Sequence, residues 1–99
     1  MGKIELCIKV VSPAMMRRLN RQYRDKDKPT DVLAFPLGGN HAILHLGDIF
    51  INREDAKTKF LPLAVHGFLH LLGLDHERSP KEAKLMFTLQ DEILNYLRN

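Results

Sequence analysis

The sequence has one cysteine, no long apolar run and no repeat or low-complexity tract. With Cys7 alone, an intramolecular disulfide is impossible, and a single thiol is typical of a reducing compartment. The longest apolar stretch runs from Phe60 to Val65, far short of the roughly 20 residues that span a membrane. The chain does not open with a charged segment followed by an apolar run, as an export signal does. These absences predict a cytoplasmic protein.

The overall composition is ordinary for a soluble globular protein. Hydrophobic residues make up 44% of the 99 residues and charged residues 27%. A chain of this length without a linker predicts one domain over residues 1–99. It is long enough to bury a modest core.

Positive charge is concentrated between Arg17 and Lys28, where six cations stand against two anions. That segment carries a net charge of +4, and since the whole chain carries +3, the remainder sums to −1. Concentrated positive charge attracts polyanions such as nucleic acids. Such a run is more commonly a solvated helix face followed by a polar loop. The cluster alone therefore does not show that the protein binds nucleic acid. The candidate contacts to the phosphates of a nucleic acid are Arg17, Arg21, Lys26 and Lys28.

The residue patterns predict an α+β fold in which a small mixed sheet is packed against helices. A half-buried first strand is predicted where apolar residues occupy every second position, at Ile4, Leu6, Ile8 and Val10. Ser12 then offers an N-cap, with Pro13 at the first helical position. The helix that follows is predicted to turn its arginines outward and to face the core with Met15, Leu19 and Tyr23.

Further strands are predicted in the middle of the chain. The apolar run from Val32 to Phe35 is ended by Pro36, which suits an edge strand or a strand end. A turn over residues 38–40 is followed by two short strands, 42–46 and 48–51.

Three helical segments are predicted after these strands. Asn52 caps a short helix over 53–60. A central helix then runs from Pro62 to about Leu72 and stops at Gly73, the residue type that best accepts a left-handed helix end. The final helix opens at Ser79 with the spacing of a capping box. Its inward face is predicted to carry Met86, Leu89, Ile93 and Leu97.

The most informative segment is HGFLHLLGLDH, which spans His66 to His76. Residues four apart lie on the same helix face, so His66 and His70 can present two nitrogens to one ion. Gly73 ends the helix, and the chain can then fold back and bring His76 to the same ion. The spacing is that of the long zinc-protease motif, except that Gly67 stands where that motif has its glutamate base.

The three imidazoles predict one zinc ion per chain, although nickel, cobalt or copper also suit such a ligand set. Three protein ligands leave a fourth position for water, which is typical of a catalytic zinc site. A lone histidine is more often an ordinary core group, and His41 and His45 have no predicted role. Asp75 keeps two interpretations, either a carboxylate that orients a histidine or a turn residue.

The histidine segment resembles the H-G-x-L-H-L-x-G-x-D-H motif of the YbeY family of metal-dependent endoribonucleases. Two further stretches match the same family in the same order. One is LNRQYRDKDKPTDVLAFP, from Leu19 to Pro36, and the other is LGDI, from Leu46 to Ile49. The combination of the three matches is highly specific.

The resemblance implies a zinc-dependent RNase that prefers single strands. It implies a role in maturation of the 3′ end of small-subunit ribosomal RNA and in ribosome quality control. The implied partners are ribosomal RNA and the small ribosomal subunit or its proteins. The histidines carry over as metal ligands, and Arg24 carries over as the arginine important for activity. We expect Arg24 to stabilise negative charge that develops on the phosphoryl group, while the other cations hold the RNA backbone.

Two departures from the family pattern stand out. The family usually has an additional strand and helix before the strand at Ile4, so the chain is N-terminally shortened relative to the family. An open sheet edge there favours oligomerisation. The family also usually has serine where Ala34 stands. If that hydroxyl binds substrate, activity or specificity is expected to be weaker here.

Two other classes of function stay open. The protease-like spacing suggests a zinc peptidase or amidohydrolase, but Gly67 has no side chain that could take a proton from water. A non-catalytic module that binds ribosomal RNA or a ribosomal protein would use the ion for folding, and the small number of evident ligands counts against it. Metal content together with turnover on RNA and on casein separates the three functions.

Overall fold

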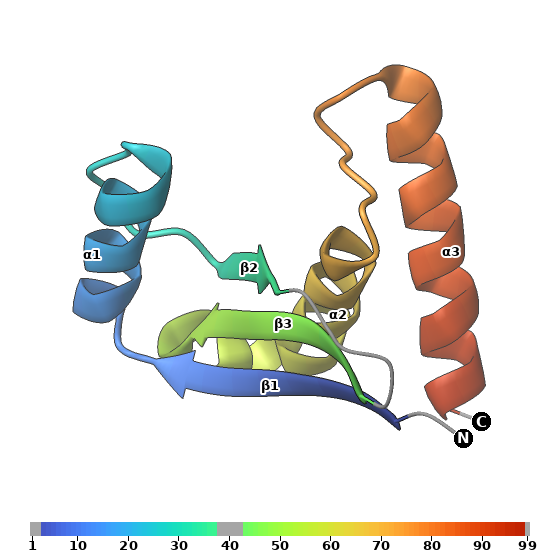
Figure 1. The fold of residues 1–99 in the computed structure, drawn as a ribbon, viewed down its shortest axis with the longest axis horizontal. Coiled ribbons are helices and arrows are strands. Elements are labelled where there is room, and N and C mark those ends of the chain that lie inside the picture. The colour runs from blue at the N-terminus through green and yellow to red at the C-terminus, as the bar shows by residue number, and fades with distance from the viewer. Residues whose placement is uncertain (1–2, 38–42, 99) are drawn as a thin grey trace.

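The computed structural model describes residues 3–37 and 43–98. Within these residues the chain forms three strands and three helices, shown in Figure 1, with the order β1 (Lys3–Val11), α1 (Pro13–Arg24), β2 (Val32–Pro36), β3 (Ile43–Asn52), α2 (Arg53–Leu71) and α3 (Pro80–Arg98). The predicted α+β class is confirmed. The turn predicted at 38–40 and the residue His41 lie outside the described residues. No helix in the described ranges is long and apolar enough to cross a bilayer.

The sheet has the order β1-β3-β2 in the described residues, with β3 parallel to β1 and antiparallel to β2. The two short strands predicted around Gly47 are one strand, β3. The pairing with β1 shifts by one residue between Glu5 and Leu6, so that Leu46 is skipped. Gly47 has a φ of +137°, and a Cβ atom there would overlap the carbonyl oxygen of Phe35. The strand therefore needs glycine at this position to stay continuous.

β1 forms where the alternation predicts it, but the expected half-burial is wrong. The side chains of its apolar row are exposed by 69%, 37%, 39% and 46% at Ile4, Leu6, Ile8 and Val10. The physical reason is that β1 is an edge strand, and α2 packs mainly over β2 and β3. Alternation of apolar residues predicts a strand, but it does not predict whether another element packs on the apolar face.

Helix α1 begins as predicted, with the Ser12 hydroxyl accepting a hydrogen bond from the Met15 amide at 3.2 Å. The predicted inward stripe is displaced by one residue, because the buried residues are Met16 and Asn20. Asn20 is turned inward by its bonds to the following loop. Its side-chain amide donates to the Lys28 carbonyl at 2.8 Å, and its main-chain carbonyl accepts from the Lys26 amide at 3.2 Å.

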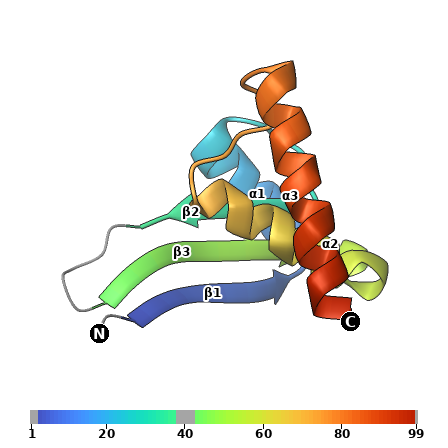
Figure 2. The ribbon, with the colours of Figure 1, turned by 90° about the vertical axis from the view of Figure 1, so that its right-hand side faces the viewer.

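Helix α2 begins at the predicted cap, where the Asn52 side chain accepts from the Glu54 amide at 3.0 Å. Its two predicted parts meet at Lys59, whose backbone is not helical. One face of the second part packs on the sheet through a cluster that includes Ile49, Ile51 and Leu63. The opposite face packs on α3, which lies against α2 and away from the sheet (Figure 2).

Helix α3 follows its cap at Ser79, whose hydroxyl accepts from the Glu82 amide at 3.0 Å. Met86 is fully buried, and Leu89 and Ile93 pack against the cluster between α2 and α3, as predicted. Leu97 is 53% exposed, and Leu94 is buried in its place.

Candidate metal centre

Two of the three histidines stand on one face of α2. Gly67 and Leu69, which flank the two histidines around the helix, are buried, whereas His66 and His70 themselves are half-buried. The Nε2 atoms of His66 and His70 are 3.2 Å apart. The helical spacing of four residues therefore brings the two imidazoles together as the sequence predicts.

The third histidine returns from the loop after α2. Gly73 has a φ of +100°, which reverses the chain at the end of the helix. The loop is then closed by hydrogen bonds from the Arg78 amide to the Asp75 carbonyl and from the Glu77 amide to the Asp75 carboxylate. As a result, the ring centroid of His76 lies 5.0 Å from that of His66.

Asp75 is held in the turn that places His76. Its carboxylate accepts from the Glu77 amide at 2.9 Å, and this bond is the largest cause of its lowered pKa. Within residues 3–37 and 43–98 the carboxylate makes no hydrogen bond to a histidine. Its negative charge raises the pKa of His70, and the choice between the two interpretations of Asp75 stays a prediction.

The donor set fits a divalent ion. One nitrogen from each of His66, His70 and His76 lies within 4.8 Å of the others. The 3.2 Å between the first two is close to the about 3.3 Å expected for two nitrogens on one tetrahedral zinc. The Nδ1 atom of His76 is buried and has no hydrogen-bond partner within the described chain. A buried nitrogen without a partner is costly, and binding to an ion would satisfy it.

The electrostatics of the site favour the neutral imidazole at His66 and His70, as metal ligation requires. Burial is the largest cause that lowers the pKa of His66, and repulsion from His76 lowers it further. Burial also lowers the pKa of His70, with contributions from the other two histidines.

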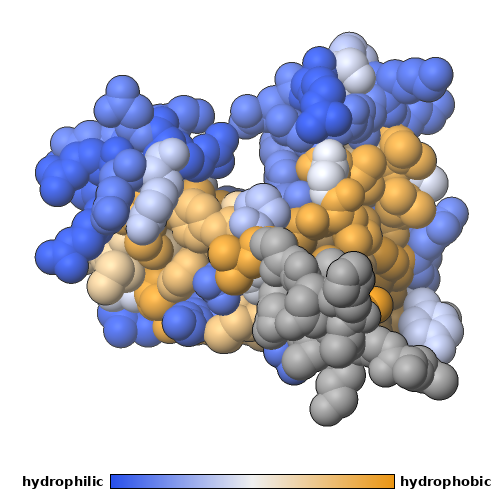
Figure 3. All heavy atoms as spheres, viewed as in Figure 1, coloured by the Kyte–Doolittle hydropathy of each residue, from blue (hydrophilic) through white to orange (hydrophobic). Residues whose placement is uncertain are grey.

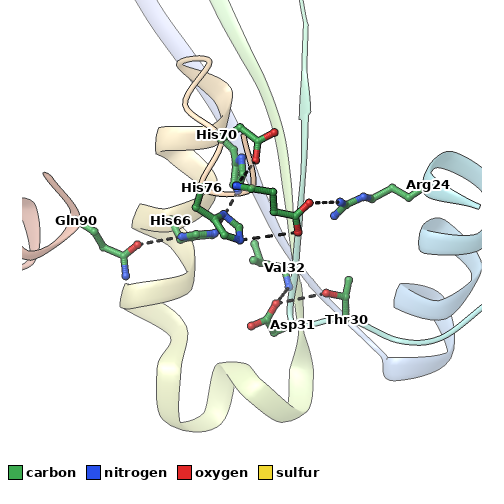
Figure 4. Close-up of polar contacts among 10 residues, drawn as sticks. Arg24, Thr30, Asp31, Val32, His66, His70, His76 and Gln90 are labelled. Carbon is green, nitrogen blue, oxygen red and sulfur yellow. Dashed lines mark hydrogen bonds and ion pairs between the residues drawn. The ribbon is translucent and has the colours of Figure 1, made fainter. Parts of the chain in front are cut away.

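Gln90 on α3 fixes the orientation of His66. The Oε1 atom of Gln90 lies 3.0 Å from the Nδ1 atom of His66 (Figure 4). A carbonyl oxygen only accepts, so this contact places the imidazole proton on Nδ1 and leaves the Nε2 lone pair towards His70. The sequence carried no signal for Gln90, because it belongs to another helix and lies outside the histidine motif.

The histidines line a cleft of about 770 Å³. One wall is formed by the end of α1 and by β2, with Tyr23, Arg24 and residues 30–36, and the other by α2, α3 and the loop between them. Figure 3 shows the cleft as a notch between the hydrophilic surface of α1 and the remainder of the molecule. Ala34, where the resembled family usually has serine, lies on the β2 wall.

Arg24 faces the histidines from across this cleft (Figure 4). The Nη2 atom of Arg24 is 4.0 Å from one oxygen of Glu77, and the other oxygen is 4.0 Å from the Nε2 atom of His76. The sequence analysis missed Glu77, although its position directly after the last histidine was a usable signal.

The other predicted phosphate contacts lie on or just after α1 and are exposed, but they do not line the cleft. Arg17 is bound in a two-pronged ion pair with Asp27, at 2.8 Å and 3.1 Å. This pair holds the pKa of Asp27 below its ordinary value. Arg21, Lys26 and Lys28 belong to the same hydrophilic surface. Two cations that the sequence analysis did not select, Lys59 and Arg78, do line the cleft.

Comparison with known proteins identifies the family. The family model described as endoribonuclease YbeY matches residues 1–98. The chain belongs to the YbeY family. An endoribonuclease YbeY from Persephonella marina is 42% identical over 97% of this chain and 72% of its own length. Another YbeY, from Aquifex aeolicus, is 37% identical over 98% of this chain and 73% of its own length.

A solved solution structure from Thermotoga maritima shares the fold of this YbeY chain. The TM-score is 0.55 at 33% sequence identity, and the match covers 90% of this chain and 65% of that one. Family membership therefore rests on sequence over nearly the whole chain, and the resemblance of the histidine motif is confirmed.

Proposed function

We propose that this chain is a metal-dependent endoribonuclease that cleaves single-stranded RNA during maturation of ribosomal RNA. The observation that carries the proposal is the convergence of three imidazoles in a cleft whose opposite wall presents an arginine. The relatives named endoribonuclease YbeY support RNA as the substrate.

His66, His70 and His76 would hold the ion, and zinc is favoured because all three ligands are imidazoles. When bound, such an ion supplies Lewis-acid chemistry and activates water near neutral pH. The contribution of the chain is to keep His66 and His70 neutral by burial and to orient His66 through Gln90. Phe87 lies beside His66 and His76 with centroids 6.3 Å and 6.0 Å away, which covers one side of the site with an apolar ring.

Arg24 would stabilise the negative charge that develops on the phosphoryl group. A planar guanidinium suits this role because it can donate two parallel hydrogen bonds to phosphate oxygens. In the structure Arg24 pairs with Glu77, at 4.0 Å and with both side chains substantially exposed. Such a loose, solvated pair is weak, so a phosphate that enters the cleft can take the place of the Glu77 carboxylate.

The packing of α2 counts against a peptidase of the zinc-protease type. A Cβ atom at Gly67 would lie 2.7 Å from the Cγ2 atom of the fully buried Ile49. The position that holds the glutamate base in that motif therefore points into the core here, and a longer side chain does not fit without displacing β3.

The deciding experiment measures metal content and cleavage together. Protein purified without added metal is analysed for bound elements, and turnover is measured on a fluorescent single-stranded RNA, on the matching duplex and on casein. We expect about one zinc per chain, cleavage of the single strand, slower cleavage of the duplex and none of casein. His70→Ala should lose both metal and cleavage. Full zinc content in that variant would refute the site, and RNA binding without cleavage would favour the non-catalytic alternative.

The role in ribosomes is a further part of the proposal. We place the substrate at the 3′ end of small-subunit ribosomal RNA, with the small subunit or its proteins as partners. Cleavage of a transcript that carries this end and its precursor tail, compared with an unrelated strand of equal length, tests it. Equal rates on the two transcripts would reduce the proposal to general cleavage of single strands.

A further inference from the structure

A partly exposed phenylalanine on α3 stands beside the candidate metal ligands. The ring centroid of Phe87 lies 6.3 Å from that of His66 and 6.0 Å from that of His76. The rings of Phe87 and His66 are stacked, with an angle of 21° between their planes. Phe87 is nevertheless 47% exposed and lines the cleft. A planar ligand in the cleft can therefore reach its ring.

The packing of α3 does not account for Phe87. In the described part of the chain, the cluster between α2 and α3 contains Met86, Leu89 and Ile93, and Phe87 is not part of it. Phe87 instead shares a face of α3 with Gln90, three positions further on, whose side chain contacts His66. A single exposed apolar residue is ordinary on a protein surface. One that lies in a cleft beside metal ligands fits a ligand pocket, which combines aromatic side chains with a few polar groups.

We propose that Phe87 stacks on a nucleobase of the RNA strand whose phosphate lies between the histidines and Arg24. The inference rests on the proposed RNase function, because it needs a phosphodiester in the cleft. Each base is joined to the neighbouring phosphate through a single sugar. A strand held at the histidines therefore brings a base close to a ring that stands beside them. Stacking of bases on aromatic side chains is a general way in which proteins hold single strands.

This contact selects single strands over duplexes. In a duplex every base is paired and stacked on its neighbours, so Phe87 reaches the face of a base only if the helix opens. A single strand can turn one base outward at little cost. Phenylalanine has no polar side-chain atom, so it cannot read the hydrogen-bonding edge of a base. We therefore expect all four bases to be accepted at this position.

Tyr23 is the weaker candidate for the same role. It is 59% exposed and lines the cleft, but it belongs to α1, on the wall opposite the histidines. Its ring already packs against Phe35, with centroids 5.0 Å apart. Phe87 contacts two of the candidate ligands, so a base next to the reacting phosphate meets Phe87 first.

The first test measures how the metal-loaded protein binds a short single-stranded RNA and the matching duplex, by fluorescence anisotropy directly after rapid mixing. Phe87→Leu keeps an apolar side chain but removes the aromatic face. It should raise the Kd for the single strand about tenfold and leave the Kd for the duplex unchanged. Phe87→Trp should bind the single strand at least as tightly as the wild type. Phe60→Leu, the same change at an exposed position that does not line the cleft, should leave both Kd values unchanged.

Metal content, measured on the same samples, separates stacking on RNA from support of the histidines. Every variant should keep the metal content of the wild type, because Phe87 is not a ligand. Loss of the ion in Phe87→Leu would show that the ring holds the histidines in place, and it would overturn the proposal.

The second test removes the base instead of the ring. The bond that the wild type cleaves is mapped, and an abasic site is placed in turn at each position beside it. For the wild type, kcat/KM at that bond should fall about tenfold at one of these positions. Phe87→Leu is expected to be slower already on the intact strand. It should lose little more at that position, because the two changes remove the same contact.

Failure of the stacking contact is distinguishable from failure of the proposed function. A wild-type protein that binds the single strand through Phe87 without cleaving it would refute the RNase function and support the contact. Cleavage in which Phe87→Leu matches the wild type, on single strand and duplex alike, would overturn the contact alone. The contact would also be wrong if Tyr23→Leu, and not Phe87→Leu, removed the preference for the single strand.

Discussion

Arg24 and Lys28 carry the same charge only four positions apart, yet the structure gives them different surroundings. Arg24 lines the cleft and faces the histidines, whereas Lys28 does not line it. Arg24→Ala should lower turnover about 10²- to 10³-fold, because it removes a preorganised donor for the developing charge. Lys28→Ala should have a small effect, since its loss removes at most one phosphate contact.

The measurement for this pair is single-turnover cleavage of RNA, with metal content determined on the same samples. Both variants should keep their metal, because neither residue is a ligand. If the two variants lose activity equally, Arg24 belongs only to the general positive surface, and its catalytic role is to be withdrawn.

The pKa shifts of His66 and His70 predict how metal binding depends on pH. Burial lowers both pKa values below the ordinary imidazole value. The imidazoles are therefore neutral at pH 7, and protons displace the ion only as the pH falls below about 6. In the ion-free protein, the imidazoles of the unfolded chain bind protons at a higher pH than those of the folded chain, because their pKa is not lowered by burial. The free energy of unfolding should therefore fall as the pH drops below about 6.5 and be steady above it. Metal retained at pH 4 would show that other groups hold the ion.

At the residue scale, the sequence predicted the histidines because their spacing follows from helix geometry. It could not predict Gln90, whose contact with His66 depends on how α3 packs against α2. Glu77 was within reach of sequence reasoning, but its place between Arg24 and His76 depends on the width of the cleft. Contacts within one helix are local, whereas contacts between elements depend on tertiary packing.

At the scale of elements, α2 packs so closely on β3 at Gly67 that we expect a larger residue there to lower stability. Gly67→Ala should destabilise the protein, because the new methyl would lie 2.7 Å from the Cγ2 atom of Ile49. Overpacking of this kind costs about 1–3 kcal/mol, offset by about 1 kcal/mol of better helix propensity. Urea unfolding followed by circular dichroism measures the difference.

The matched variant for this prediction is Ile49→Leu, which removes the branch at Cβ and keeps the volume of the side chain. The combination with Gly67→Ala should lose less stability than the sum of the two single changes. Strict additivity would mean that the two positions do not contact each other as the structure has them.

The elements themselves were largely predictable, and the errors have a common cause. Caps at Ser12 and Asn52 and the stop at Gly73 are set by local chemistry, and they lie where the sequence placed them. The burial of β1 and the inward face of α1 were wrong because both depend on neighbours. α2 leaves β1 largely uncovered, and the bonds of Asn20 to its loop turn α1 by one position.

For the whole molecule, the hydrophilic surface of α1 predicts a strong salt dependence of RNA binding. The logarithm of affinity should fall linearly with that of salt concentration, by about 0.7 per contacted phosphate on a single strand. Arg21→Ala should lower this slope by about 0.7, whereas Arg17→Ala should change it less, because Asp27 already occupies the Arg17 guanidinium. Fluorescence anisotropy at several salt concentrations measures both. Binding that ignores salt would indicate contacts that are not ionic.

The two walls of the cleft differ in how many buried residues hold them to the core, so they should unfold at different urea concentrations. α1 buries two residues, Met16 and Asn20, while α2 buries six. Elements with few buried contacts open locally before the molecule unfolds. Arg24 should therefore leave the site in low urea while the histidines stay assembled. Cleavage should disappear at a lower urea concentration than bound metal does, and simultaneous loss would show that the two walls unfold as one unit.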